Sequence, residues 1–334
     1  MRFGRRGFLR AAAGLGGIAI VRLGRASAAG AGACVTIHRT GQAFGAAATI
    51  TACHARRETA ERAIEAAFAA VRGLERVLSL YVPESQIVRL NRAGRLESPD
   101  RDLVAVLRKA QAIAERSGGA FDVTVQPLWD LYAEARRAGT LPTDEAIEAA
   151  RRLVDWRAVD VSDARIVLGR RGMAITLNAL AQGYAADRAI AVLRAHGVRH
   201  ALVDTGEIAA LGAKPDGAPW IVGIRNPREG EALAARVALA DGALSTSADD
   251  ATRFSADGTD HHIFDPATGR SPQRLASVSV VAPSATDADA LSTAALVLGP
   301  ERGLALVREW AAAEAFFIFK NGAVLATEGF PRAA

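Results

Sequence analysis

Hydrophobic residues recur at helical spacing along several stretches of the chain. In residues 59–80 the apolar positions repeat every three or four residues, as on one face of a helix: Ile64, Phe68, Val71, Leu74 and Leu78. Residues 101–116 repeat this pattern and stop at Ser117-Gly118-Gly119, a typical C-terminal helix signal. The remaining predicted helices cover residues 143–154, 178–196 and 286–298.

A second pattern, alternation of polar or small residues with β-branched ones, predicts β-strands. It is clearest in residues 276–282, which read A-S-V-S-V-V-A. The other predicted strands cover residues 35–39, 46–52, 159–168, 173–177, 202–211, 220–224, 315–319 and 323–327. Asn321-Gly322, between the last two, is a strong type I′ hairpin signal. Because helices and strands are interspersed, with many antiparallel signals, we assign the chain to the α+β class.

The first 28 residues have three parts in the order of a twin-arginine export signal. Arg5-Arg6 is followed by an apolar run over residues 11–21 and by Ala26-Ser27-Ala28, a small-x-small cleavage site. The apolar run is too short to span a bilayer, and we expect no later stretch to reach the required length. We therefore predict a signal that is removed near Ala28 and a periplasmic mature protein. An uncleaved anchor is the alternative.

Composition predicts a compact globular protein after this signal. Half of the residues are apolar, which is enough for one large or two small cores, and we predict a single domain over residues 29–334. The net charge of +5 falls to about −1 once the arginines of the signal are removed. The mature chain is therefore not basic, and we expect no nucleic-acid partner.

Cys34 and Cys53 are the two cysteines of the chain, and neither belongs to a C-x-x-C motif. Zinc and iron–sulfur sites therefore have no support. If the hairpin between them turns at residues 41–45, the two cysteines fall opposite each other, and a cross-strand disulfide is geometrically possible. The periplasm permits disulfides. Twin-arginine export carries folded chains, so we expect the fold not to depend on this bond.

Two stretches suggest a ligand site. Residues 117–128 read S-G-G-A-F-D-V-T-V-Q-P-L, where two glycines precede polar groups threaded through an apolar run. This is typical of backbone that approaches a ligand, or of a helix cap followed by a buried strand. Asp289 and Thr293 lie four residues apart on one helical face and are hard oxygen ligands suited to Mg²⁺. From the spacing alone we favour the simpler interpretation, in which Asp289 interacts with the helix dipole from the first turn.

Five motifs in order resemble the ApbE family of FAD:protein FMN transferases. They are L-S-L-Y-x-x-x-S-x-I-x-x-L-N at 78–91, S-G-G-A-F-D-V-T-V-Q-P-L at 117–128, A-x-G-Y-A-A-D at 181–187, H-H-I-F-D-P-A-T-G-R at 261–270 and A-D-A-L-S-T at 288–293. Each motif alone is weak, but five in register over residues 40–326 are specific. The resemblance reverses our preference for the helix-dipole interpretation of Asp289.

The resemblance implies an α+β, T-fold-like domain around one flavin site. Members move the FMN part of FAD to a threonine or serine of a target protein, release AMP and need Mg²⁺. By this resemblance, the side chains of Asp289 and Thr293 and the carbonyl of Ala179 hold Mg²⁺. His262 is then the base that takes the proton from the target hydroxyl, a role that suits a pKa near neutrality. The alternative for His261 and His262 is a loop pair that hydrogen-bonds the backbone.

The same resemblance places the flavin and the nucleotide. The flavin is expected against Phe44 and Tyr81, although Tyr81 could equally be a core aromatic residue. The backbone of Ala120, Phe121 and Asp122 is expected around the nucleotide. Two further expected cofactor contacts, Thr176 and Gln182, depart from the family pattern.

The departures concentrate around the nucleotide. Many members have aspartate at the position of Thr176, which puts FAD affinity in doubt, and Lys or Glu at that of Gln182. Many have M-G-T where this chain has Phe44-Gly45-Ala46, and T-S-G where it has Thr246-Ser247-Ala248. Thr205-Gly206-Glu207 stands where many have G-G-D.

Three functions remain open from the sequence. The first is an FMN transferase that acts on a periplasmic or membrane-anchored redox protein. The second is a protein that binds and delivers FAD without transfer, and the third is a Mg²⁺-dependent FAD pyrophosphatase. Because Asp289, Thr293 and His262 match the family pattern, we favour the transferase.

Overall fold

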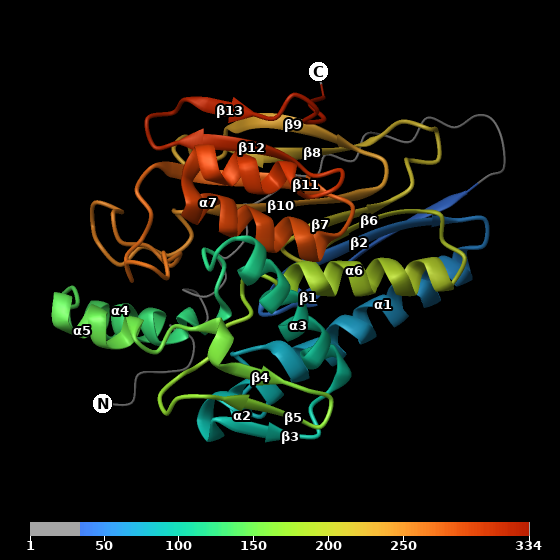
Figure 1. Cartoon of the computed structure of the whole chain (residues 1–334). Helices are drawn as coiled ribbons and strands as arrows, with labels where there is room; N and C mark the ends of the chain where they lie inside the picture. The colour runs from blue at the N-terminus through green and yellow to red at the C-terminus, as the bar shows by residue number, and fades with distance from the viewer. Residues whose placement is uncertain (1–33, 334) are drawn as a thin grey trace.

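A computed structural model describes residues 34–333 of the chain (Figure 1). The predicted export signal over residues 1–28 lies outside the described residues. The described part is an α+β structure in which one large antiparallel sheet is covered by helices on one face. This arrangement agrees with the class predicted from the interspersed helical and strand patterns.

The large sheet has eight strands in the order β1-β2-β6-β7-β10-β11-β12-β13, and every neighbouring pair is antiparallel. Its strands are β1 (Val35–Ala43), β2 (Ala46–His54), β6 (His200–Asp204), β7 (Ile208–Leu211), β10 (Gly242–Ala248), β11 (Leu275–Ala282), β12 (Glu314–Phe319) and β13 (Val324–Ala326). A hairpin of β8 (Trp220–Arg225) and β9 (Leu233–Leu239) packs on the face opposite the helices, where Trp220 and Val237 meet Phe316 in one apolar cluster.

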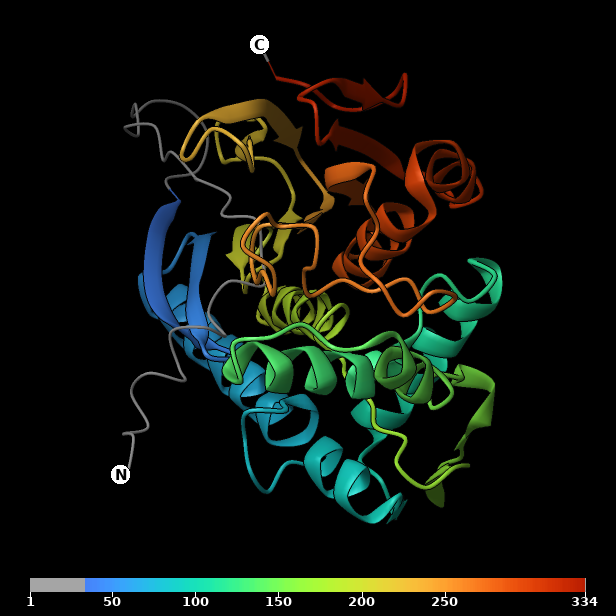
Figure 2. The same cartoon turned by 90° about the vertical axis from the view of Figure 1, so that its left-hand side faces the viewer.

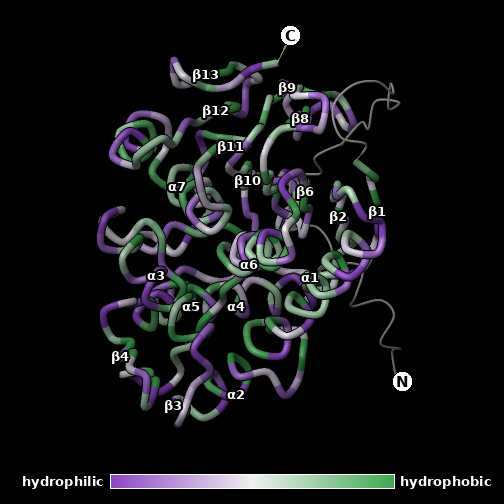
Figure 3. The backbone as a smooth tube through the Cα atoms, turned by 90° about the vertical axis from the view of Figure 1, so that its right-hand side faces the viewer, coloured by the Kyte–Doolittle hydropathy of each residue, from purple (hydrophilic) through white to green (hydrophobic). Residues whose placement is uncertain are grey.

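Three long helices cover the other face: α1 (Arg57–Leu78), α6 (Ala181–Ala195) and α7 (Ala285–Arg308). Helix α6 lies between α1 and α7 and contacts both (Figure 3). The main hydrophobic core fills the space between these helices and the sheet, with Ile50, Phe68 and Leu291 among its buried side chains. Burial of this apolar surface is the main driving force for the layered arrangement.

The remaining elements form a smaller lobe below the helical layer in Figure 1. Its three-stranded sheet has the order β3-β5-β4, with strands β3 (Arg95–Glu97), β5 (Arg165–Leu168) and β4 (Val159–Val161). Its helices are α2 (Gln86–Ala93), α3 (Arg101–Arg116), α4 (Gln126–Arg137) and α5 (Asp144–Arg151), together with the short 3₁₀ helices η1 (Val123–Val125) and η2 (Trp156–Ala158). Thr143 is the N-cap of α5, since its hydroxyl accepts a hydrogen bond from the backbone of Ala146.

Three predicted strands are wrong. Residues 159–168 form the two strands β4 and β5, which pair antiparallel with each other. Residues 202–211 form the two strands β6 and β7, because Gly206, with φ +102°, reverses the chain between them. Residues 173–177 form no strand and pair with none within residues 34–333. The Asn91 side chain bonds both the N–H and the C=O of Ile175, and Thr176 donates to the carbonyl of Val123. These contacts satisfy the backbone without a sheet partner.

In the segment after α3, the helix cap of the alternative interpretation is present, but no buried strand follows it within the described residues. Gly118 and Gly119 both have positive φ and close α3, with a hydrogen bond of 2.7 Å from Gly119 N to Ala114 O. Asp122 then caps η1 by accepting from the backbone of Thr124, and the chain continues directly into α4. Local capping, which an apolar run does not reveal, makes this segment helical.

Within the described residues, α7 is the one helix that is long and apolar enough to cross a membrane by length and composition. The expectation that no later stretch reaches this length is therefore wrong. However, 61% of its apolar window is buried inside the protein, because α7 packs on β10 and β11. The helix extends beyond the predicted 286–298 to Arg308, with a kink at Gly299 before Pro300.

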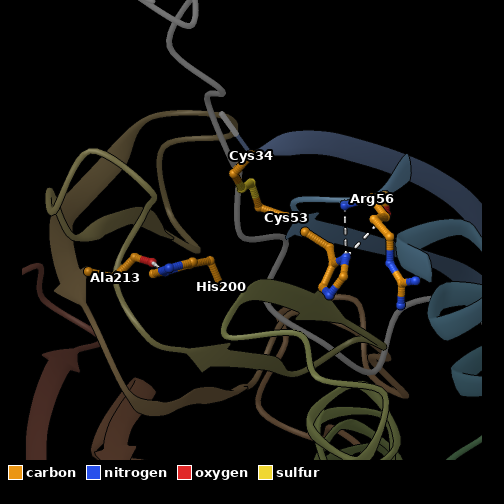
Figure 4. Close-up of a disulfide and its surroundings, with 6 residues drawn as sticks. Cys34, Cys53, Arg56, His200 and Ala213 are labelled. Atoms are coloured by element: carbon orange, nitrogen blue, oxygen red, sulfur yellow. Dashed lines mark hydrogen bonds between the residues drawn. A yellow bond between two sulfur atoms is a disulfide. The ribbon is translucent and has the colours of Figure 1, made fainter. Parts of the chain in front are cut away.

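Cys34 and Cys53 form a disulfide with a Cα–Cα distance of 5.8 Å (Figure 4). The predicted pair is confirmed, but the two cysteines do not lie opposite each other, because the strand register differs from the predicted one by two residues. The hairpin turns at Phe44-Gly45, so Cys53 lies opposite Thr36, and Cys34 lies just beyond the paired part of β1. The bond therefore joins the start of the first strand diagonally to its neighbour.

We expect both thiols to resist alkylation until a reductant is added, when the protein is prepared from an oxidising compartment. A disulfide that closes a loop of this size contributes about 3 kcal/mol. Since β1 and β2 already pair, the double variant Cys34→Ser/Cys53→Ser should lose at most that amount and keep its fold. Intact mass and thermal melting measure this, and two alkylated thiols in the unreduced protein would contradict it.

Candidate active site

A cavity of about 820 Å³, open to solvent, lies where the large sheet, α7 and the small lobe meet. Most of the residues predicted for the site line it, although they come from distant parts of the chain: Ala120, Phe121, Asp122, Thr176, Ala179, His262, Asp289 and Thr293. Asn178, Glu207 and Ser247 also line the cavity, and the sequence prediction had not selected them as site residues. The structure thus brings the predicted metal, base and nucleotide positions into one place.

Three predicted cofactor residues do not line this cavity. Phe44 occupies the β1–β2 turn with φ 50° and packs against the main core. Tyr81 is 39% exposed; its partial burial raises its pKa, while interaction with the Asn178 side chain opposes that rise. Tyr81 is therefore neither in the core nor in the cavity, but beside a residue that lines it. The expected flavin contacts of Phe44 and Tyr81 stay predictions.

Gln182 was expected to contact the cofactor, but it does not line the cavity. Its side-chain amide donates to the carbonyl of Thr205 at 3.1 Å, and the Thr205 hydroxyl donates to the carbonyl of Gln182 at 3.0 Å. Its side chain therefore points into the turn between β6 and β7 and not into the cavity. Both bonds are buried, so they fix this turn to the start of α6.

Asp289 projects into the cavity from the second turn of α7. Ser284 is the N-cap of this helix, and the acidic residue in the first turn is Asp287. The helix-dipole interpretation of Asp289 is therefore wrong, since the dipole effect falls off within the first turn. Asp289 is only 4% exposed, and its Oδ2 accepts a hydrogen bond of 3.1 Å from the backbone N–H of Gly183.

Hydroxyl groups surround the same position. The Thr293 hydroxyl lies 2.7 Å from that of Ser247 on β10, which also lies 2.8 Å from the Ser292 hydroxyl. Ser292 in turn donates to the backbone carbonyl of Asp289 at 2.8 Å. Ser247 stands in the T-S-A triplet already noted as a departure, which was the available signal for it. This network holds oxygen atoms beside the carboxylate in a fixed arrangement.

The first half of α6 fixes the position of α7. Asp187 accepts hydrogen bonds from the backbone of Ala285 at 2.8 Å and of Thr286 at 2.9 Å, and from the Ser284 hydroxyl at 2.8 Å. These bonds satisfy free N–H groups at the start of α7 with a charged side chain from another helix. One turn earlier, Gly183 leaves no room for a Cβ atom, which would clash with the Ala285 carbonyl and approach Asp289.

Glu207 was missed as a site residue. It follows Gly206 in the β6–β7 turn, is 4% exposed and lines the cavity. Burial raises its pKa well above the usual value, and the nearby Asp289 carboxylate adds to that rise. Burial likewise raises the pKa of Asp289 to about 7, against the opposing hydrogen bond from Gly183. The sequence signal that could have selected Glu207 was the T-G-E triplet at residues 205–207, in which an acidic residue directly follows a turn residue.

His262 lines the cavity from the loop that follows β10. Its backbone N–H donates to the carbonyl of Thr252, and its Nδ1 is buried without a hydrogen-bond partner among the described residues. Burial lowers its pKa to about 4, below the near-neutral value expected for a base, so its imidazole is neutral at pH 7 but a weaker proton acceptor than an ordinary histidine. For His261 the alternative interpretation holds, because its ring nitrogen Nε2 lies 3.2 Å from the carbonyl of Pro272.

An aromatic cluster anchors this loop to α4 and α5. Phe264 lies 5.0 Å from Tyr132 between ring centroids, and Phe254 lies 5.5 Å from Tyr132. In Figure 2 the orange loop runs beside the green helices α4 and α5. Such aromatic pairs add to the free energy of burial. His262 lies two residues before Phe264, so this cluster sets its position.

Asp122 shapes the opposite wall of the cavity. Its carboxylate accepts hydrogen bonds from the backbone of Thr124 at 2.8 Å, the Thr124 hydroxyl at 2.6 Å and the backbone of Trp156 at 3.1 Å. The Asp122 side chain therefore joins η1 to η2 through these hydrogen bonds. Asp122 can therefore offer a ligand mainly its backbone, and the expected backbone contacts of Ala120, Phe121 and Asp122 with the nucleotide stay predictions.

Residues 44–317 match a family model described as the ApbE family. The chain belongs to the ApbE family. The match covers the five motifs on which the resemblance was based, so that resemblance is confirmed.

Similar proteins of the ApbE family include characterised sequences and solved structures. The FAD:protein FMN transferase of Treponema pallidum is 36% identical over 288 residues, which cover 80% of each chain. The protein of that name from Escherichia coli K12 is 30% identical and covers 74% of each. The ApbE protein of Thermotoga maritima superposes with a TM-score of 0.79 at 28% identity, covering 90% of this chain and 100% of its own. The apo flavinyl transferase ApbE of Pseudomonas stutzeri gives 0.77 at 32% identity, covering 88% and 95%.

We expect Gly183→Ala to destabilise this ApbE-family chain by about 1–3 kcal/mol, since the methyl group would force α6 and α7 apart. Gly73→Ala in α1 is the matched control. There the added Cβ has only the end of Arg76 within 4.0 Å, so the change should stabilise by about 0.5–1 kcal/mol. Urea unfolding of both variants measures the difference. Equal stability of Gly183→Ala and the parent would contradict the close packing.

Proposed function

We propose that this chain moves the FMN part of FAD to a threonine or serine hydroxyl of a protein and releases AMP, with Mg²⁺ bound in the cavity. The observation that supports this best is the meeting of Asp289, Thr293, Ala179 and His262 in one cavity. Asp289 and Thr293 belong to one motif and His262 to another, while Ala179 lies two residues before a third motif, more than eighty residues earlier in the sequence. The relatives named FAD:protein FMN transferase support the same reaction.

The residues in the cavity fit a Mg²⁺ ion. The Asp289 carboxylate, the Thr293 hydroxyl and the backbone at Ala179 are hard oxygen donors, which Mg²⁺ prefers. No lysine or arginine is among the described residues that line the cavity, so the buried carboxylates have no basic partner there. A bound cation would offset their charge. When present, Mg²⁺ would also neutralise charge on the pyrophosphate of FAD.

Different residues of the cavity are proposed to bind the nucleotide and to transfer the proton. Backbone at Ala120, Phe121 and Asp122 would hold the nucleotide, with Thr176 beside it. The target hydroxyl oxygen attacks the phosphorus atom of the FMN part, and the phosphorus–oxygen bond to AMP breaks. His262 takes the proton of that hydroxyl group, which its neutral imidazole can accept. The product is a phosphoester between FMN and the target protein.

We further propose that the enzyme acts in the periplasm on a periplasmic or membrane-anchored redox protein. The three-part pattern of residues 1–28 and the Cys34–Cys53 disulfide support export to an oxidising compartment. Fractionation of cells that express the full chain tests the location. A mature protein in the cytoplasmic fraction that still begins at Met1 would contradict it.

Incubation of the mature protein with FAD and Mg²⁺ tests the reaction, with and without a candidate acceptor protein. Chromatography follows AMP and FMN, and in-gel fluorescence follows flavin bound to protein. AMP together with a fluorescent acceptor band supports the transferase. AMP with free FMN alone indicates a pyrophosphatase, and FAD that binds without AMP release indicates a binding protein.

We expect Asp289→Ala to abolish Mg²⁺-dependent AMP release while the fold is kept. Asp289 has no basic partner among the described residues of the cavity, and in the metal-free protein its removal loses one hydrogen bond, from the backbone of Gly183. His262→Ala should instead lower the rate by roughly 10²–10⁴-fold without loss of the metal, as for a lost general base. AMP release and circular dichroism are measured for each variant. Near-normal turnover of Asp289→Ala with Mg²⁺ would show that the metal site is elsewhere.

We expect Thr176→Asp to tighten FAD binding. Thr176 lines the cavity, and its hydroxyl now accepts only a long hydrogen bond of 3.3 Å from the backbone of Asn178. A hydrogen bond to a charged group contributes about 1.5–3 kcal/mol at best, or roughly tenfold to a hundredfold in affinity. Calorimetric titration with FAD measures the change. Thr176→Asn, which is neutral, is the control, and an unchanged or weaker affinity of Thr176→Asp would mean that this part of the site is built differently.

A further inference from the structure

We infer that Glu207 supplies a second carboxylate to the cation site around Asp289, an inference that rests on the proposed function. The residues predicted for the cation include a single carboxylate, Asp289. The structure places a second buried carboxylate on the same cavity, from a hairpin turn more than eighty residues earlier in the chain. The ligand class is a hard divalent cation such as Mg²⁺ or Mn²⁺.

The turn that carries Glu207 is held rigidly. Gly206 has φ +102°, and a Cβ atom at this position would collide with the side-chain amide of Gln182. The same Gln182 is joined to Thr205 by the two buried hydrogen bonds described above. Thr205 also donates from its backbone to the carbonyl of Glu207 at 3.1 Å. Glu207 therefore enters the cavity from a constrained backbone.

Consecutive residues of α6 hold both carboxylates. Gln182 fixes the turn that bears Glu207, and Gly183 donates its backbone N–H to Asp289. Ala179, whose carbonyl is the third predicted ligand, lies three residues before Gln182. One helix start therefore positions all three oxygen donors relative to one another. Such shared support is what a preorganised ion site requires.

The surroundings of the two carboxylates favour a cation between them. Both residues are 4% exposed, and no lysine or arginine is among the described residues lining the cavity. Burial of charged groups is costly unless they are paired or coordinate a metal. Asp289 and Glu207 together with neutral hydroxyl and carbonyl oxygens give an all-oxygen donor set, which suits Mg²⁺ or Mn²⁺ better than softer metals.

Calorimetric titration of the mature protein with Mn²⁺ tests the inference without any measurement of activity. We expect Glu207→Gln to raise the Kd for Mn²⁺ by tenfold or more and to reduce the rise in Tm that Mn²⁺ causes. Glu207→Asp, which keeps the charge, should bind more tightly than Glu207→Gln. Glu207→Ser, also neutral, gives the same comparison if Glu207→Gln does not fold.

Asp204→Asn is the matched control. Asp204 lies on the same hairpin and does not line the cavity, and its Oδ1 accepts from the backbone of Gly206 at 2.9 Å, which asparagine can still do. This variant should change the Kd for Mn²⁺ by less than threefold. An equal loss in Asp204→Asn and Glu207→Gln would overturn a specific role for Glu207.

The two proposals fail in different ways. If Asp289→Asn loses Mn²⁺ binding while Glu207→Gln binds as the parent does, the role of Glu207 is overturned and the proposed cation site stands. If the parent protein binds no Mn²⁺ in the presence of AMP, the cation of the proposed function fails, and the role of Glu207 fails with it.

Discussion

The contact between α6 and α7 is the constraint on which the rest of the site depends. Asp187 of α6 caps the first residues of α7, and Gly183 lets the two helix backbones approach without a side chain between them. The cap compensates N–H groups that would otherwise be buried unsatisfied, and the close approach buries apolar surface of both helices. Asp289 reaches the cavity only because α7 starts where Asp187 holds it.

The same contact links the two sides of the molecule. Through Gln182, α6 also holds the β6–β7 turn, so the sheet and α7 take their positions around one helix start. The small lobe closes the cavity from the other side, where Asp122 joins η1 to η2. A buried polar network is favourable only when each of its groups has a hydrogen-bond partner. The partners of Gln182 and Asp122 are therefore needed to keep the two walls of the cavity in place.

His262 depends on a separate set of contacts. Its loop is held by backbone hydrogen bonds, including the one from His262 to Thr252, and by aromatic packing against α4, chiefly Phe264 on Tyr132. The burial that results keeps the imidazole neutral, and so in the form that accepts a proton. Asp289 and His262, the proposed metal ligand and the proposed base, are therefore positioned by different elements, and a change in one set of contacts should leave the other in place.

The sequence by itself determined the α+β class, the helices with strong periodicity and the membership of the ApbE family. It also selected eight of the residues that line the cavity, among them Asp289, Thr293 and His262, which lie in motifs whose local spacing is readable. Phe44, Tyr81 and Gln182 were selected by the same resemblance, yet the structure places them outside the cavity. A motif fixes the identity and spacing of residues but not the direction of a side chain.

The features that depend on long-range contacts were decided only by the tertiary structure. It split residues 202–211 into two strands at Gly206, left residues 173–177 without a sheet partner, and placed Glu207 beside Asp289. None of these follows from local propensity, because each depends on hydrogen bonds between residues more than twenty positions apart: Asn91 to Ile175, Gln182 to Thr205 and Gly183 to Asp289. The pattern along the chain records which residues prefer burial, and the packing of α6 against its neighbours decides where they meet.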